Sequence, residues 1–415
     1  MASSTTAILK RIIGALVIFA FIVRLWLFAD MFLLHTPINE WGFTEYLINF
    51  SGGFVRRGII GEGLFAMARI GIPTSIIVLL IKAVSMVCYA AVLGFFIWQF
   101  RKHRWNWWII LAPVFMGFVM CIIRKDFMQE LMLIGMLAML GHDRYAKGRV
   151  ALWVATAMCI IELLIHEAFV FWGIPIIVML IYTSTTARWE KIVSITVIVS
   201  TFITMCWFKG SPGIASDIIQ SWQPYFPDLQ EQTSSSIGAI GWDTLWTFRF
   251  HCMTNFCSPT IGWLRLPLQL AAFICYTYMV CNFVYTFSPP GHQRELMRGR
   301  LTAVYMLTAT CMIPMFTVLS VDYSRLYQYL CVTSFATVLL IPGARLDRGL
   351  PGWLKRFTTC LNNTVDSYFT PSKGLMVALL FLSDINGIHQ LNDAGVGTLV
   401  SLYHGLLMAV HYVLG

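Results

Sequence analysis

The chain has 415 residues, of which 58% are hydrophobic and only 12% are charged, and its mean hydropathy is +0.72. Soluble domains carry about 25% charged residues, so apolar side chains replace half of the usual charge. Several apolar windows run for about 20 residues, the length that crosses a bilayer as a helix. The composition excludes an ordinary soluble protein. It predicts an all-α, polytopic membrane protein, with residues 1–415 forming a single integral membrane domain.

Neither the charge nor the cysteines indicate another class of protein. The net charge of +9 does not predict nucleic-acid binding, because polytopic proteins gather Lys and Arg in cytoplasmic loops and no long basic tract is present. Most of the cysteines lie in or beside apolar spans, and none belongs to a paired CxxC zinc pattern. Cys252 and Cys257 share a polar external loop. In an oxidising compartment they could form a disulfide, and the alternative is that both are free thiols.

The first half of the chain predicts seven spans. Lys10 and Arg11 precede the first, 12–34, and no small-residue cleavage site follows it, so we expect this span to stay as an anchor. An external segment, 35–73, comes next, and apolar residues at helical spacing around 59–70 predict an interfacial helix. The further spans are expected at about 74–100, 106–123, 127–141, 150–168, 169–186 and 191–208.

The second half begins with the largest external loop, 209–262, which is rich in Pro, Ser and Trp. Its aromatic residues suit either sugar stacking or a membrane interface belt. Spans follow at about 266–287, 301–320 and 326–342, with two less regular ones at 374–390 and 396–413. Most Lys and Arg residues then fall on one side, so the positive-inside rule predicts about ten to twelve helices with both termini cytoplasmic.

A glycine-rich loop at 49–62, Asn-Phe-Ser-Gly-Gly-Phe-Val-Arg-Arg-Gly-Ile-Ile-Gly-Glu, departs from this pattern. It carries Arg56 and Arg57 on the external side, where basic residues are scarce. Glycine lets a backbone approach a ligand closely, and arginine presents a rigid fork of donors that suits phosphate. The loop predicts an anion clamp. The alternative is a tight turn whose arginines reach up to the lipid headgroups.

Other ionisable residues fall at the same external helix ends. Glu162 and His166 are four residues apart and could hydrogen-bond across one helix face, although a structural helix-end histidine gives the same pattern. Asp322 and Arg325 could form a plain surface ion pair, and Arg124 could neutralise Asp126. No second His follows His166 at the metalloprotease spacing, so no metal site is expected.

This set of residues suits chemistry on a phosphate-linked substrate carried by a lipid. Arginine and lysine would bind the phosphates and stabilise them as a leaving group, while a carboxylate or histidine would take a proton from a sugar hydroxyl. The candidate catalytic residues are His166, Glu167, Glu40, Asp126 and Asp322. The candidate pyrophosphate-binding residues are Arg56, Arg57, Arg124, Lys125 and Arg325.

Four short motifs also carry a resemblance: SGGFVRRGIIGE, the RKD after the third span, IHEAFVFWGIP, and the DYSR before the tenth. They resemble Wzy-type polymerases of bacterial O-antigen, capsule and exopolysaccharide clusters, which are similar to C-type membrane glycosyltransferases. The similarity covers short stretches within residues 40–330.

The resemblance implies a protein of the bacterial inner membrane that works at its periplasmic face. It would transfer a glycan from undecaprenyl pyrophosphate to a lipid-linked repeat unit, without a cofactor. Its partners would be that lipid-linked oligosaccharide, membrane lipid and a chain-length regulator, with no nucleic acid. By the same resemblance Arg56, Arg57, Arg124 and Arg325 would hold pyrophosphates.

Two alternatives stay open. One is a C-type glycosyltransferase with a polyprenyl-phosphate sugar donor, in which Glu40 after the first span would act. The other is a lipid-oligosaccharide transporter or flippase. Transporters often contain internal repeats and bind substrate near the membrane midplane, whereas no repeat is visible here and the charges gather at one face.

Overall fold

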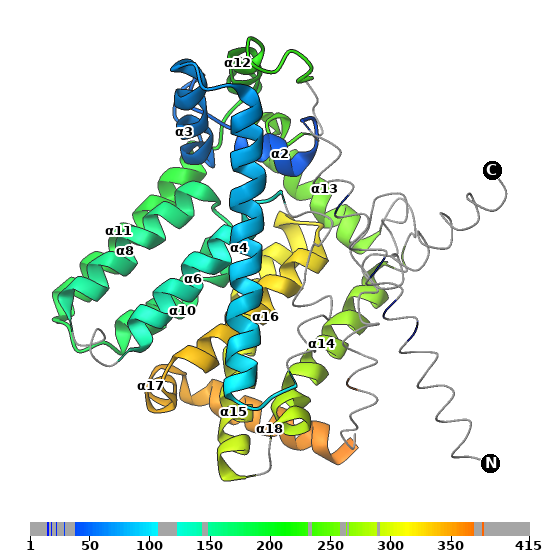
Figure 1. The fold of residues 1–415 in the computed structure, drawn as a ribbon. Coiled ribbons are helices and arrows are strands. Elements are labelled where there is room, and N and C mark those ends of the chain that lie inside the picture. The colour runs from blue at the N-terminus through cyan, green and yellow to red at the C-terminus, as the bar shows by residue number, and fades with distance from the viewer. Residues whose placement is uncertain are drawn as a thin grey trace.

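The computed structural model describes residues 38–106, 123–142, 148–230, 235–257, 265–288 and 291–368, and the single positions 15, 18, 22, 29, 263 and 376. Within these residues the chain is helical and contains no strand, which confirms the all-α class (Figure 1). Nearly all of the expected spans at 12–34, 106–123 and 374–390, and the whole of 396–413, lie outside the described residues. Both termini lie there too.

The described helices follow the expected spans in order. The helices are α2 (Trp41–Tyr46), α3 (Gly58–Arg69), α4 (Thr74–Lys102), α6 (Asp126–Gly141), α8 (Arg149–Ile165), α9 (Phe169–Trp172), α10 (Ile174–Tyr182), α11 (Arg188–Trp207), α12 (Pro212–Trp222), α13 (Thr244–Phe256), α14 (Arg265–Phe287), α15 (His292–Cys311), α16 (Tyr323–Leu340), α17 (Gly343–Gly349) and α18 (Gly352–Tyr368). A 3-10 turn, η4 (Gly238–Gly241), and a π-helical turn, η5 (Met315–Leu319), complete the set.

Three of the described helices, α4, α11 and α14, are long and apolar enough to cross a membrane. The other elements at expected spans are shorter or more polar. The span expected at 150–168 ends at Ile165, because His166 is extended, and the span expected at 169–186 is divided into α9 and α10 at Gly173. The helix expected around 59–70 is confirmed as α3.

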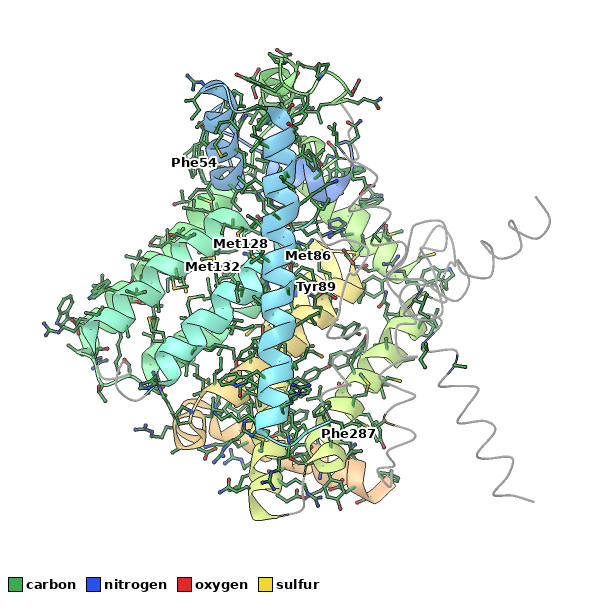
Figure 2. All side chains as sticks on the ribbon, in the orientation of Figure 1. Phe54, Met86, Tyr89, Met128, Met132 and Phe287 are labelled. Carbon is green, nitrogen blue, oxygen red and sulfur yellow. The ribbon has the colours of Figure 1, made fainter. Side chains whose placement is uncertain are left out.

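Two hydrophobic cores meet along α4. The larger core joins α6, α8, α10, α14, α15 and α16 with the second half of α4. The smaller core joins α2, α3, α12 and the first turns of α4 through Ile77 and Ile81. Between them lies a third, small cluster, to which Met86 and Tyr89 of α4 and Met128 of α6 belong (Figure 2). We call the smaller unit, formed by α2, α3, α12 and η4, the cap.

The expected external loop 209–262 is largely structured in its described part. It supplies α12 to the cap, where the buried Trp222 donates its indole N–H to the carbonyl of Leu47 at 2.6 Å. Trp222 is therefore a core residue and not a sugar platform. Farther along the loop, α13 packs against η5, and its Cys252 and Cys257 are both free thiols.

Two glycines bring the cap into close contact with the rest of the chain. A Cβ at Gly61 of α3 would lie 1.9 Å from the carbonyl oxygen of Ile48, and one at Gly42 of α2 would lie 2.2 Å from that of Ile123. Only glycine permits these approaches. The second contact places α2 directly against residues 123–125, which precede α6. Polar residues of the cap therefore lie at the boundary between the two cores.

Candidate active site

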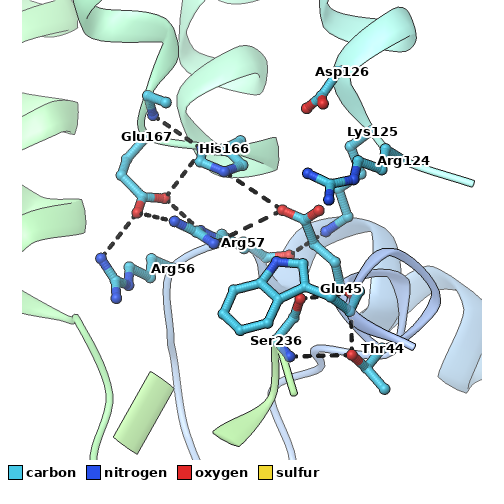
Figure 3. Close-up of polar contacts among 12 residues, drawn as sticks. Thr44, Glu45, Arg56, Arg57, Arg124, Lys125, Asp126, His166, Glu167 and Ser236 are labelled. Carbon is cyan, nitrogen blue, oxygen red and sulfur yellow. Dashed lines mark hydrogen bonds and ion pairs between the residues drawn. The ribbon is translucent and has the colours of Figure 1, made fainter. Parts of the chain in front are cut away.

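One carboxylate, Glu167, whose side chain is 14% exposed, holds both arginines of the glycine-rich loop. The Glu167 carboxylate accepts hydrogen bonds from Arg56 Nη1 at 2.9 Å, from Arg57 Nε at 2.8 Å and from Arg57 Nη2 at 2.6 Å (Figure 3). The two bonds from Arg57 form a bidentate fork. Burial alone would raise the pKa of Glu167, but Arg57 and Arg56 outweigh it and hold that pKa well below its ordinary value.

The backbone at Arg57 is unusual. Its φ is +65°, the left-handed region that side chains other than glycine rarely adopt, and it immediately precedes the first residue of α3. The backbone N–H of Arg56 is held by the carbonyl of Phe208, 3.0 Å away at the end of α11. Left-handed residues other than glycine persist where the surrounding structure holds them, and they cluster at functional sites. The turn thus aims both guanidinium groups at Glu167.

His166 lies between two carboxylates. Its Nδ1 accepts the backbone N–H of Ala168 at 3.1 Å, so the proton of the neutral ring belongs on Nε2. Nε2 lies 3.5 Å from Glu45 Oε1, and Nδ1 lies 3.7 Å from Glu167 Oε2. Burial lowers the pKa of His166 well below its ordinary value, and the positive charge of Arg57 lowers it further. The ring is therefore neutral and presents an N–H to Glu45.

Glu45 is the site residue that the sequence argument missed. It is fully buried at the end of α2, and neither of its carboxylate oxygens has a hydrogen-bond partner among the described residues. Two ionisable groups lie within 4 Å of its Oε1, the neutral His166 at 3.5 Å and Arg57 Nη1 at 3.8 Å. The expected acid, Glu40, is instead exposed at the start of the same helix. No pattern in the sequence separates it from Glu40, because both acids follow the first expected span and only packing buries one of them.

Lys125 supports the same cluster from the loop before α6. It is fully buried, and its ammonium donates to the backbone carbonyl of Arg57 at 2.9 Å and lies over the ring of Tyr46 at 5.8 Å. Burial lowers the pKa of Lys125 to about 8. Lys125 therefore fixes the position of the arginine loop as well as adding positive charge.

A second set of ion pairs joins the starts of α6 and α16. Arg325 pairs with Asp126, whose Oδ1 also accepts the hydroxyl of Tyr329 at 2.5 Å. Arg124 Nη1 lies 3.3 Å from Asp322 Oδ2. The local pairs expected within each segment, Arg124 with Asp126 and Asp322 with Arg325, are thus replaced by pairs across the two helices. These ion pairs join residues that are nearly 200 positions apart in the chain.

The expected hydrogen bond between the side chains of Glu162 and His166 does not form. His166 leaves the helix, so its ring turns away from that face, while both carboxylate oxygens of Glu162 lack a hydrogen-bond partner in the described chain. Gln129 of α6 instead donates to the backbone carbonyls of Glu162 and His166, at 3.1 and 3.3 Å. Each of those carbonyls also accepts a backbone N–H, from His166 and Phe169 respectively, so Gln129 adds a second donor at the end of α8.

Aromatic residues of the 209–262 loop continue a chain of rings that begins at Trp41 of α2. Trp41 lies 5.9 Å from Trp242, which lies 5.5 Å from Trp246, and Trp246 stacks on Phe250 at 5.2 Å between centroids. Trp246 is half exposed. Exposed indole faces of this kind can stack on sugars or lie in a membrane interface.

The expected cations and carboxylates therefore converge, with Glu45 in the place expected for Glu40. The part of the chain that the structure describes contains no group of three His, Cys, Asp or Glu side chains arranged to hold a metal ion. Arg56 Nε is buried and has no partner among the described residues, so donors remain for a further anion. Comparison of the chain with protein-family models, curated proteins and solved structures found no match.

Proposed function

We propose that the protein is a polytopic glycosyltransferase of the bacterial inner membrane that polymerises polysaccharide repeat units at the periplasmic face. Its donor is a glycan on undecaprenyl pyrophosphate, and its acceptor is the next lipid-linked repeat unit. In this proposal about ten to twelve helices cross the membrane, and both termini are cytoplasmic. The observation that carries the proposal is a cluster in which Arg56 and Arg57 hold the Glu167 carboxylate, beside the buried Glu45, the neutral His166 and the buried Lys125.

The arginine pair supplies the site for the pyrophosphate. Guanidinium groups bind phosphate oxygens through paired, charge-assisted hydrogen bonds. In the structure the donors of Arg57 and one donor of Arg56 contact Glu167, while Arg56 Nε has no described partner. An incoming pyrophosphate would take the Nε donor and compete with Glu167 for the others. The same groups would stabilise the charge that grows on the leaving pyrophosphate.

Glu45 is the best-placed general base. The acceptor hydroxyl oxygen would attack the anomeric carbon of the donor, and the bond from that carbon to the pyrophosphate oxygen would break. The bonding electrons leave with the pyrophosphate, and the hydroxyl proton passes to the Glu45 carboxylate. The lone pair of His166 Nδ1 is occupied by Ala168 N–H, so His166 would orient Glu45 through Nε2–H.

The test is elongation of undecaprenyl-pyrophosphate-linked repeat units by the purified protein in liposomes. The wild type should make polymer, and Glu45→Gln, which keeps the shape but removes the base, should lose at least about a hundredfold in rate. Glu40→Gln is the matched control and should retain activity, because Glu40 is exposed. Movement of the lipid oligosaccharide across the bilayer without elongation would identify a flippase instead.

A second candidate is a C-type transferase that uses a polyprenyl-monophosphate sugar. In that class an acid after the first span would act. Glu45 lies in that segment and is buried beside Arg57, which favours this second candidate. The two candidates differ in donor. Transfer of a single sugar from polyprenyl monophosphate, with no elongation of pyrophosphate-linked units, would select the second.

A further inference from the structure

One face of α11 is apolar and exposed along its length. Ile192, Val199, Ile203 and Trp207 recur at spacings of seven, four and four residues, which places them on one side of the helix. Trp207 is 82% exposed, and the opposite side of α11 packs against α8. We call these four residues the α11 stripe. From Ile192 to Trp207 it extends about 22 Å, most of the thickness of a bilayer's hydrocarbon core.

The stripe ends at the arginine pair. The carbonyl of Phe208, the residue after Trp207, accepts the backbone N–H of Arg56 at 3.0 Å. Figure 1 shows the same arrangement, with one end of α11 directly beneath α3.

The exposed edge of the charged cluster faces this end of α11. The side chain of Arg56 is 29% exposed, compared with 16% for Arg57 and 12% for Arg325. Phe54 lies on the outer edge of the cap beside α3 (Figure 2), and its ring lies 5.3 Å from that of Phe208. A cation that is open to one side, beside exposed aromatic rings and at the end of an apolar helix face, suits a ligand with an anionic head and a long apolar tail.

We propose that the α11 stripe holds the isoprenoid chain of the donor, so that the lipid enters from the bilayer side with its pyrophosphate on Arg56. The inference rests on the proposed function and adds the route of the lipid. Charge complementarity at Arg56 selects a lipid with a phosphate head, and the length of the stripe favours a long chain over a short one.

The experiment measures binding of inorganic pyrophosphate, farnesyl pyrophosphate and undecaprenyl pyrophosphate to the full-length protein in nanodiscs, with phosphatidic acid as competitor. The wild type should bind undecaprenyl pyrophosphate most tightly, farnesyl pyrophosphate less tightly and inorganic pyrophosphate least tightly. The double variant Ile203→Ser with Trp207→Ala should weaken undecaprenyl pyrophosphate binding by at least about tenfold, since it removes apolar contact area. It should leave inorganic pyrophosphate binding unchanged.

The matched control is Val87→Ser with Trp98→Ala on α4, another helix long enough to span a membrane, where both side chains are also exposed. The control should not change any of the affinities. All four residues are on the surface, so neither double variant disturbs a core.

The outcomes separate the two proposals. If inorganic pyrophosphate binds but the isoprenoid chain adds nothing, or phosphatidic acid competes equally, the stripe proposal is overturned and the anion site stands. A change of oligomeric state in the Ile203→Ser, Trp207→Ala variant would make the face a contact between copies, and would overturn it too. If neither inorganic nor lipid pyrophosphate binds the wild type, the proposed function itself fails.

Discussion

At Glu167, two guanidinium groups replace the water that burial removes from the carboxylate. Transfer of an unpaired charge into a protein interior costs several kcal/mol, and paired, hydrogen-bonded charges recover part of that cost. Arg57 makes two of the three hydrogen bonds and Arg56 makes one. The geometry of the pair, and not only its charge, therefore keeps Glu167 ionised.

We predict that Arg57→Lys impairs activity although the charge is retained, because one ammonium cannot reproduce a bidentate fork. Arg56→Lys should have a smaller effect on protein stability, since Arg56 contributes a single bond to Glu167. The measurements are the elongation rate in liposomes and the melting temperature in detergent. Full activity of both lysine variants would reduce the pair to interface anchors.

Lys125 predicts a pH dependence of stability. Burial lowers its pKa from 10.5 to about 8 in the folded protein. Between pH 8 and about 10.5 the unfolded chain therefore binds more protons at this residue, and stability rises with pH across that window. Below pH 8 both states are protonated, and the folded state carries the full cost of the buried charge.

The comparison of the wild type with Lys125→Met isolates this contribution. Melting temperatures in detergent at pH 7, 8.5 and 10 should show the wild type gaining on the variant as the pH rises. A difference between the two proteins that does not change with pH would contradict the assignment.

At the scale of elements, helix starts bring the charges together. α6 and α16 both begin at the cluster, and Arg325 and Arg124 reach across to the acids of the other helix. Sequence spacing favoured pairs within each segment, since neighbours three or two residues apart can contact. The packing of α6 against α16 offers the cross pairs instead. Spacing along a chain identifies which charges are near a helix end, but helix packing selects the partners.

Two glycines of α3 give a matched test of the cap. Gly61→Ala would place a Cβ 1.9 Å from a backbone oxygen, so α3 must move; we expect a loss of about 1–3 kcal/mol or more in stability, together with lower activity. Gly63→Ala, on the exposed side of the same helix, meets no atom within 4 Å and should gain up to about 1 kcal/mol. The free energy of unfolding of the two variants measures both effects. Equal changes in the free energy of unfolding would show that the close approach of α3 to the Ile48 carbonyl does not contribute to stability.

At the scale of the whole molecule, α4 connects two ends of different character. Its first turns pack against the cap, and its last residues are Arg101 and Lys102. In Figure 1 the helices α12 and α3 lie at one end of α4, and α17 and α18 lie at the other. The basic residues of α17 and α18, among them Lys355 and Arg356, suit the cytoplasmic side.

This arrangement predicts the accessibility of cysteines in intact cells. Cys360 on α18 is exposed, and Gln220 on α12 is an exposed site for an introduced cysteine. In a variant carrying Gln220→Cys, with Cys206, Cys252 and Cys257 each changed to Ser, a membrane-impermeant maleimide should label position 220 in spheroplasts and label Cys360 only after lysis. The opposite pattern would invert the proposed topology and place the charged cluster in the cytoplasm.

The positions of the longest helices could be predicted from the apolar runs in the sequence. The helices α4, α11 and α14 match the expected spans within a few residues, because long uninterrupted apolar runs have few alternatives. The prediction was weaker where a helix ends at a polar residue. α8 stops at Ile165 because His166 is extended, and that turn redirects the histidine from Glu162 toward Glu45. A local pattern contains no information about that redirection.

The sequence by itself determined the helical class, the apolar spans of α4, α11 and α14, and the concentration of arginines in a glycine-rich loop, because hydrophobicity and glycine content act locally. Only the tertiary structure decided which carboxylates those arginines contact. Glu45 joins them and Glu40 does not, since the close approach at Gly42 sets α2 against the segment before α6 and Glu45 is buried there, while Glu40, just before the helix, is exposed. Burial is a property of packed surfaces, and it separates two acids that differ by five positions in one short helix.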